Sequence, residues 1–339
     1  MRDPLFRTAI TEFFGIRHPI LCGGLMWLAD GRYVAAVVNA GGMGFITALS
    51  FPDPEAFRDQ IRLCRDLTGG KPFGVNISVS RRPGVNERLQ PHVAIAIEEG
   101  VRFVETSGSS PAPILARLHE AGVKVMHKVP AVRYALAAQR EGVDAVAVVG
   151  AECGGHPGYM MIGTMVQAAL ASRQIEVPLV IGGGIGTGRQ VLGALAMGAD
   201  GVLLGSRMIA AEEIWAHRRY KERVVAGDGT DSRVVMQLFK GHHRVLDNEA
   251  AQAVAALEAQ GVTDFAAYRD LVAGEKVRGA YESGDFSQGM IDYGQSVAFV
   301  DGIEPVETIF DSLIDDAAAA RARLDGLWAD RADARRATA

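Results

Sequence analysis

The chain has 339 residues, of which 48% are hydrophobic, and a formal net charge of −5 at pH 7. This composition allows a large buried core, argues against a nucleic-acid partner, and contains no apolar run of the ~18 residues that a membrane span needs. Residues 1–15 lack the apolar stretch of a signal peptide, and the three scattered cysteines favour a reducing, cytoplasmic setting over a disulfide framework.

A repeated local pattern predicts most of the elements. Several amphipathic stretches end in glycine and continue into a short run of Val, Ile and Leu, as in "REGVDAVAVVG" (140–150). Glycine there suits the left-handed residue that closes a helix, and such runs are typical of parallel strands buried on both faces. The predicted strands, in chain order, are 19–22, 43–47, 72–78, 101–106, 123–128, 143–149, 177–182 and 200–205. The clearest predicted helices are 53–66, 111–121 and 130–140.

Eight strand–helix units favour one α/β architecture. Their alternation predicts a parallel sheet, and the count of eight points to a closed (β/α)8 TIM barrel. The alternative is a doubly wound open sheet, but this chain has no G-x-G-x-x-G loop after its first strand. We therefore predict a barrel made of 1–225 and 286–325, with two closing helices within 287–324. A small, mostly helical lobe is predicted after the eighth unit, over 226–285.

The loops after the last two strands indicate a phosphate site. "GGGIGTG" (182–188) follows the seventh strand and "GSRM" (205–208) follows the eighth. Backbone N–H groups in such loops bind phosphate oxygens, and barrels commonly bind phosphate in this place. Because the spacing departs from G-x-G-x-x-G, we predict a mononucleotide phosphate. The alternative is that the glycines only form tight turns.

Two polar residues stand late in apolar strands, Asn76 in the third and Lys128 in the fifth. A buried ammonium group needs an anion or an electron-rich carbonyl nearby. A flavin ring would suit both side chains, since lysine stabilises negative charge on the reduced ring and asparagine bonds its pyrimidine edge. The alternatives are a structural salt bridge for Lys128 and a strand-end turn for Asn76.

The loop after the sixth strand, "AECGGHPG", carries the histidine His156. Two glycines before it would let the backbone pass close to a flat cofactor, and imidazole suits proton transfer near neutral pH. The other interpretations are a metal site shared with Cys153, a Cys153 nucleophile, and a purely structural histidine. No further cluster completes a metal site, so no metal is predicted. His242 and His243 are expected to be solvated or to belong to a lid.

Taken together, "PILCGGLMW", "GVNIS", "HK", "ECGGHPG", "GGGIGTG" and "LLGSRM" resemble the nitronate monooxygenase family, formerly called 2-nitropropane dioxygenases, over about residues 6–320. The resemblance implies a barrel that binds FMN non-covalently beneath a helical lobe, with His156 as the catalytic histidine. The FMN contacts that it implies are Gly23, Gly24, Met26, Asn76, Lys128, Gly155, Gly183, Gly184, Gly205 and Ser206.

The resemblance also implies the reaction. Alkyl nitronates would be oxidised with O2, through a flavin semiquinone, to carbonyl compounds and nitrite. Similar barrels are NADH:quinone reductases or FMN-dependent enoyl-ACP reductases, so the alternative is an NAD(P)H-dependent reductase acting on quinones or enoyl thioesters. A barrel that binds a phosphorylated ligand without redox chemistry is a third hypothesis. The expected partners are the small-molecule substrate and O2, without nucleic acid or membrane, and a homodimer is left open.

Overall fold

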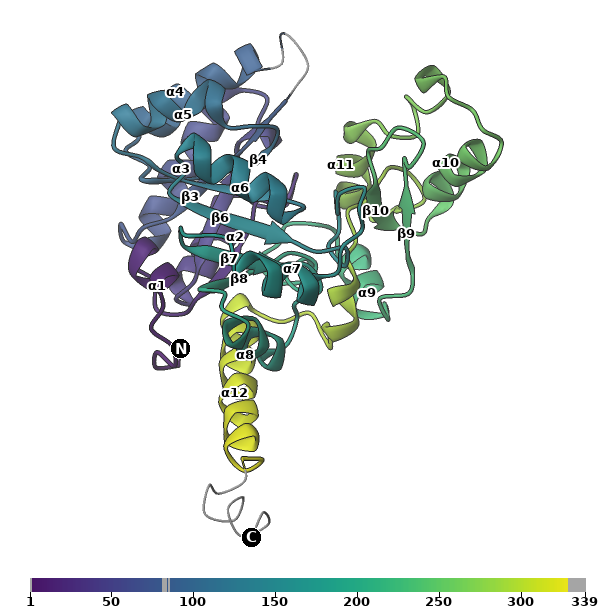
Figure 1. The fold of residues 1–339 in the computed structure, drawn as a ribbon. Coiled ribbons are helices and arrows are strands. Elements are labelled where there is room, and N and C mark those ends of the chain that lie inside the picture. The colour runs from purple at the N-terminus through teal and green to yellow at the C-terminus, as the bar shows by residue number, and fades with distance from the viewer. Residues whose placement is uncertain (1, 81–83, 85, 329–339) are drawn as a thin grey trace.

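The computed structural model describes residues 2–80, 84 and 86–328. Its centre is a closed barrel in which eight parallel strands pair in chain order and the eighth returns to the first (Figure 1). The strands are β1 (Ile20–Cys22), β2 (Met43–Thr47), β3 (Gly74–Val79), β4 (Phe103–Gly108), β5 (Lys124–Val129), β6 (Ala145–Val149), β7 (Leu179–Gly182) and β8 (Gly201–Leu204). The predicted (β/α)8 barrel is confirmed, and the predicted ranges overlap all eight strands.

Helices alternate with these strands on the outside of the barrel (Figure 1). They are α1 (Ala9–Phe14), α2 (Gly31–Asn39), α3 (Pro54–Thr68), α4 (Gln90–Glu98), α5 (Ala112–Glu120), α6 (Val132–Glu141), α7 (Thr164–Ala171), α8 (Gly188–Ala196) and α9 (Arg218–Val225), with the 3-10 turns η1 (Ala48–Ser50) and η2 (Asn86–Leu89). Helix α3 shows how capping residues mark the two ends of a helix in the sequence. The Asp53 carboxylate caps its start, and Gly69 ends it with φ 62°. Over the ranges that the structure describes, no helix is long and apolar enough to cross a bilayer.

Helix α1 closes the amino-terminal end of the barrel. Phe14 packs against the inward-facing rings of Phe45 and Phe103, with centroids 6.0 and 5.0 Å away. Because side chains alternate along a strand, Glu105, two residues after Phe103, also faces the interior, one layer higher. The barrel therefore has an apolar floor at one end and a polar layer near the carboxyl ends of its strands.

After α9 the chain builds a group of elements beside the barrel (Figure 1). They are the antiparallel pair β9 (Ser232–Val235) and β10 (His243–Leu246), then α10 (Glu249–Ala259), the 3-10 turn η3 (Phe265–Ala267) and α11 (Gly274–Ser283). Val235 of β9, Val245 of β10 and Tyr268 belong to a separate hydrophobic cluster with α10, whereas Ala280 and Tyr281 of α11 belong to the main core. We propose that the lobe spans 226–285. Besides the expected helices, it contains the strand pair β9–β10.

The chain returns to the barrel through the 3-10 turn η4 (Gln295–Phe299) and α12 (Val306–Asp325), which lies along α8. The prediction of two closing helices within 287–324 is wrong, because only α12 is an α-helix there. The preceding segment is extended, since Asp292 forms a β-bridge with Val245 of β10.

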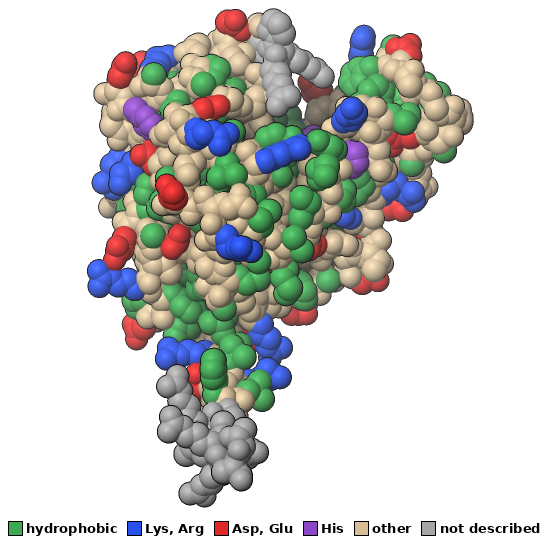
Figure 2. Space-filling model, viewed as in Figure 1, with side chains coloured by type: hydrophobic (Ala, Val, Ile, Leu, Met, Phe, Trp, Pro, Cys, Tyr) green, Lys and Arg blue, Asp and Glu red, His purple; other side chains and the backbone are tan. Residues whose placement is uncertain are grey.

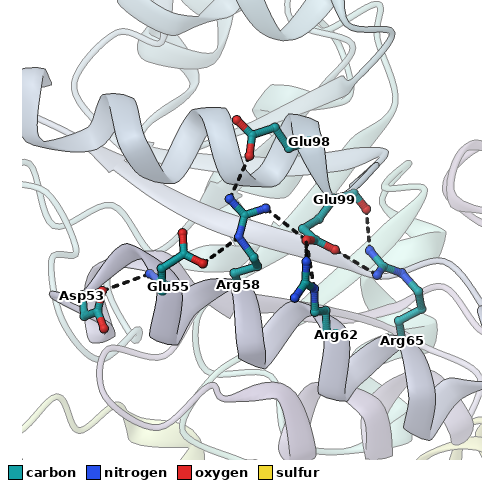
Figure 3. Close-up of polar contacts among 7 residues, drawn as sticks. All are labelled: Asp53, Glu55, Arg58, Arg62, Arg65, Glu98 and Glu99. Atoms are coloured by element: carbon teal, nitrogen blue, oxygen red, sulfur yellow. Dashed lines mark hydrogen bonds and ion pairs between the residues drawn. The ribbon is translucent and has the colours of Figure 1, made fainter.

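A cluster of ion pairs fastens α3 to α4 (Figure 3). Arg58 Nη1 and Arg62 Nη2 lie 3.1 and 2.8 Å from Glu99 Oε1, and Arg65 Nη1 lies 3.0 Å from Oε2. Spacing close to one helical turn places the three guanidinium groups on one face of α3. Desolvation raises the pKa of Glu99, but the hydrogen bonds from the arginines prevail and lower it to about 2.

We expect Glu99→Gln to lower the free energy of unfolding by about 1–3 kcal/mol, because charge-assisted hydrogen bonds are lost. Since folding lowers the pKa of Glu99, this stabilisation is present above the unfolded value of ~4.3 and is lost as the pH falls toward about 2. Urea unfolding at pH 7 and at pH 3 measures both effects. Glu98→Gln, which removes a more exposed carboxylate on Arg58, is the control and should change little. Equal losses in the two variants would contradict a central role for Glu99.

Candidate active site

The polar layer of the barrel is organised around Glu105 of β4, which is fully buried. Its Oε1 lies 2.9 Å from Lys128 Nζ of β5. Its Oε2 accepts hydrogen bonds from Asn76 Nδ2 of β3 at 2.8 Å and from Gly24 N at 2.9 Å. The strand register creates this cluster, since Asn76 and Glu105 are partners across β3 and β4. A lone carboxylate at this depth would be costly, so the donors and the carboxylate depend on one another.

Glu105 is thus the partner of both Lys128 and Asn76. For Lys128 this is the structural salt bridge predicted as the alternative to a flavin contact. Lys128 keeps further N–H donors, and its side chain is 21% exposed at the mouth of the barrel. Sequence reasoning missed Glu105, although it carries the signal that singled out Lys128. It is a charged residue within an apolar strand and therefore needs a partner.

The loop after β1 packs directly on this cluster. A Cβ at Gly24 would come within 2.4 Å of the Asn76 Cβ, and one at Gly23 would lie 3.2 Å from Glu105 Oε1. Contacts within the protein therefore already favour a residue without a side chain at both positions. Met26, further along the loop, is 39% exposed, and its Sδ accepts a hydrogen bond from Ser50 Oγ at 3.8 Å.

The loops after β7 and β8 present backbone donors that fit a phosphate group. Gly183 and Gly184 have φ of 98° and 72°, in the left-handed region. Within the described part of the chain, the N–H groups of Gly183, Gly184 and Ser206 make no hydrogen bond. Ser206 Oγ accepts one from Gly294 N at 2.8 Å and keeps its own proton to donate. A Cβ at Gly205 would meet no atom within 4 Å, so open space lies beside these donors.

His156 is stacked on a second histidine, His243 of β10, with ring centroids 4.5 Å apart and planes 16° from parallel. A β-bridge between Gly155 and Arg244 joins the two segments through N–H···O bonds of 3.0 and 2.7 Å. His243 is expected from the sequence to be solvated or to belong to a lid, and the first of these is disfavoured because its side chain is only 16% exposed. The backbone bridge explains this burial, since it draws β10 onto the loop after β6.

Asp292 holds His243 from the other side. Its Oδ1 lies 2.5 Å from His243 Nε2. Burial raises the pKa of Asp292, but the hydrogen bond and charge of His243, with smaller effects from His156 and Lys128, lower it overall. An ionised carboxylate can only accept, so His243 Nε2 carries the proton of this hydrogen bond. No sequence motif had pointed to Asp292.

Desolvation, together with His243, lowers the pKa of His156 to about 4, against an opposing effect of Asp292. The ring is nevertheless exposed, so it is accessible from outside the core. Near neutral pH it is uncharged and can accept a proton. Histidine side chains are visible where the barrel meets the elements beside it (Figure 2).

Cys153 lies in the same loop, three residues before His156. Burial raises the pKa of its thiol to about 12, which disfavours the nucleophile and metal-ligand interpretations. Among the residues that the structure describes, no group of three or more His, Cys, Asp or Glu side chains is placed to hold a metal ion.

Known proteins share this sequence and architecture. The model of the family described as "Nitronate monooxygenase" matches residues 7–316. A Rhodococcus jostii (strain RHA1) protein named "(3aS,4S,5R,7aS)-5-hydroxy-7a-methyl-1-oxo-octahydro-1H-indene-4-carboxyl-CoA dehydrogenase" is 33% identical over 72% of this chain and 66% of its own length. A "Probable nitronate monooxygenase" of Staphylococcus aureus (strain JH9) is 28% identical over 69% of this chain and 76% of its own. The solved structure of FabK from Thermotoga maritima is 32% identical, with a TM-score of 0.87, over 95% of this chain and 100% of that chain.

We expect Lys128→Met to lower the free energy of unfolding by about 3–5 kcal/mol, because it leaves the buried Glu105 carboxylate without its counter-ion. Adding Glu105→Gln should recover part of this loss, since both charges then leave together. Urea unfolding at pH 7 measures both variants. Lys124→Met, at the exposed start of the same strand, is the control and should cost less than ~0.5 kcal/mol. Equal losses for the two lysine variants would contradict the importance of the Lys128–Glu105 pair.

Proposed function

This chain belongs to the nitronate monooxygenase family, and we propose that it is an FMN-dependent oxidoreductase that converts nitroalkanes or their nitronates, with O2, to carbonyl compounds and nitrite. The observation that carries the proposal is His156, an accessible and uncharged imidazole in the loop that follows β6 at the carboxyl end of the barrel. Such a base can take the proton from the carbon next to a nitro group. The remaining contacts of the site support this assignment.

FMN would sit at the carboxyl ends of the strands. The free N–H groups of Gly183, Gly184 and Ser206 suit its phosphate, and the remaining donors of Lys128 suit the polar edge of its ring. The residues proposed to contact it are Gly23, Gly24, Met26, Asn76, Lys128, Gly155, Gly183, Gly184, Gly205 and Ser206. When bound, FMN would supply the electron-accepting chemistry and the reaction with O2.

An uncharged His156 suits a neutral nitroalkane, because it can accept the proton from the carbon next to the nitro group. The guanidinium of Arg244, whose Nε donates to Ala151 O in the same loop, supplies positive charge for the nitronate that forms. The exposed Tyr159 and Met160 follow in the same loop and offer apolar surface for a larger substrate.

A second candidate is an NAD(P)H-dependent FMN oxidoreductase acting on a thioester. The name of the Rhodococcus relative favours it, since that protein is called a carboxyl-CoA dehydrogenase. The carbon next to a thioester carbonyl also carries an acidic proton, so an uncharged His156 would serve this substrate too. Quinones are the other substrate class of this candidate.

Anaerobic mixing of the FMN-loaded protein decides between the two candidates. The visible band of oxidised flavin is followed while nitroethane, NADH or NADPH is added separately. We expect nitroethane to bleach the band and both nucleotides to leave it. Bleaching by a nucleotide, with the colour restored by an enoyl-CoA or a quinone, would support the second candidate instead. Failure of the protein to bind FMN would overturn both.

The proposed phosphate site in the loops after β7 and β8 leads to a separate prediction. Gly205→Val would fill the open space beside the free donors, and we expect at least ~10-fold weaker FMN binding, about 1.4 kcal/mol, with unchanged thermal stability of the FMN-free protein. Gly193→Ala in α8 also points into open space and is the control. It should bind FMN normally and gain about 0.5–1 kcal/mol of stability. Fluorescence titration with FMN measures the affinity, and normal binding by Gly205→Val would place the phosphate elsewhere.

A further prediction follows from the proposed role of His156 as the base. His156→Asn should keep FMN and lose about 10²–10⁴-fold in turnover of neutral nitroethane, the usual contribution of a general base. Because the pKa of His156 is about 4, kcat/KM of the unsubstituted enzyme should stay level from pH 8 to about pH 5 and fall as the base becomes protonated below that. Steady-state nitrite formation across this pH range tests both statements. Intact turnover in His156→Asn would show that His156 is only structural.

A further inference from the structure

Backbone bridges hold the loop after β6, strand β10 and the segment around Asp292 edge to edge. Gly155 exchanges two hydrogen bonds with Arg244, and Val245 of β10 bridges Asp292. Arg244 Nε also donates to Ala151 O at 3.2 Å in the loop after β6. The side chains of His156, His243 and Asp292 therefore project from a rigid arrangement, and the distances between them are set by backbone pairing.

We propose that His243, held by Asp292, is a positioning residue that stacks on His156, fixes the orientation of its ring and keeps it uncharged as a base. This inference rests on the proposed function for what the base acts on. The arrangement of the three side chains itself is independent of that function.

The geometry of the two rings decides how they influence each other. Their ring centroids lie 4.5 Å apart and their planes are almost parallel, so the ring nitrogens, whose bonds lie in the ring planes, do not point at one another. The coupling is therefore one of packing and charge. A positive charge on either ring disfavours one on the other, and His243 lowers the pKa of His156. The Asp292 carboxylate, 2.5 Å from His243 Nε2, holds the His243 ring in place.

The other charged and ionisable groups around the pair are held by partners of their own or buried. Lys128, from β5, is paired with Glu105 at 2.9 Å. Cys153 stays a thiol at neutral pH, because burial raises its pKa to about 12. Glu152 is turned toward Thr164, whose N–H and hydroxyl it binds at 2.9 and 2.7 Å. The guanidinium of Arg244 remains charged throughout. A change in the titration of His156 therefore reports on His243 and Asp292.

The test is an NMR titration of the histidine ring protons in the FMN-free protein, with the His156 signal identified by its loss in His156→Asn. In the unsubstituted protein the midpoint of His156 should lie at about 4. His243→Phe keeps a stacked ring but removes its charge and its bond to Asp292, so the midpoint should rise by about one pH unit or more. His242→Phe, at the neighbouring position, is the matched control and should leave the midpoint unchanged. An unchanged midpoint in His243→Phe overturns the inference.

The loaded enzyme supplies a second readout. In His243→Phe the acid limb of the kcat/KM profile should move upward by the same amount as the NMR midpoint. A merely structural role would lower stability or FMN content and leave this limb in place. If neither nitroethane nor ethylnitronate reduces the flavin, the proposed function fails while the NMR result still decides on His243. If His243→Phe does not fold, His243→Gln, which keeps a donor for Asp292 and removes the titrating ring, replaces it with the same two outcomes.

Discussion

The buried carboxylate of Glu105 is the constraint on which the mouth of the barrel depends. A charge with no exposed surface must be compensated inside the protein, and here the donors come from β3, β5 and the loop after β1. These elements can share one carboxylate only in the register that the barrel has. The cluster therefore positions the loop after β1 and, because it pairs with Lys128, sets the charge of the site above it.

The polar layer and the stacked pair His156 and His243 come from different parts of the chain. Strands β3 to β5 bring the charge-compensated cluster into the upper interior of the barrel, where strand pairing fixes its geometry. The elements after α9 reach back over the rim and add His243 and Asp292 beside His156. The barrel is thus proposed to hold the cofactor, while His243 and Asp292 from outside it lie against the proposed base. Relatives with different names can share the barrel, since substrate choice depends on the rim.

Much of the fold could be predicted from the sequence because strands and helix ends are marked by residues close together in the chain. Apolar runs bounded by glycine marked the strands, and caps such as Asp53 and Gly69 marked helix ends. The prediction of a second closing helix failed because the segment around Asp292 pairs with β10, and that pairing is a tertiary contact. For the same reason the sequence left open whether His243 is solvated or part of a lid, since its polar neighbours in the chain say nothing about the ring that stacks on it.

The sequence by itself determined the eight-stranded barrel, the glycine loops after β7 and β8, and the places of Asn76, Lys128 and His156, because each depends on periodicity or on a short motif. Only the tertiary structure decided what these residues meet. Gly24 and Glu105 are 81 positions apart, and His243 and Asp292 are 49 apart. Their pairing depends on strand register and on the return of β10 to the barrel, and no local pattern encodes either. The physical reason is that a buried charge or imidazole takes its protonation and its role from neighbours in space.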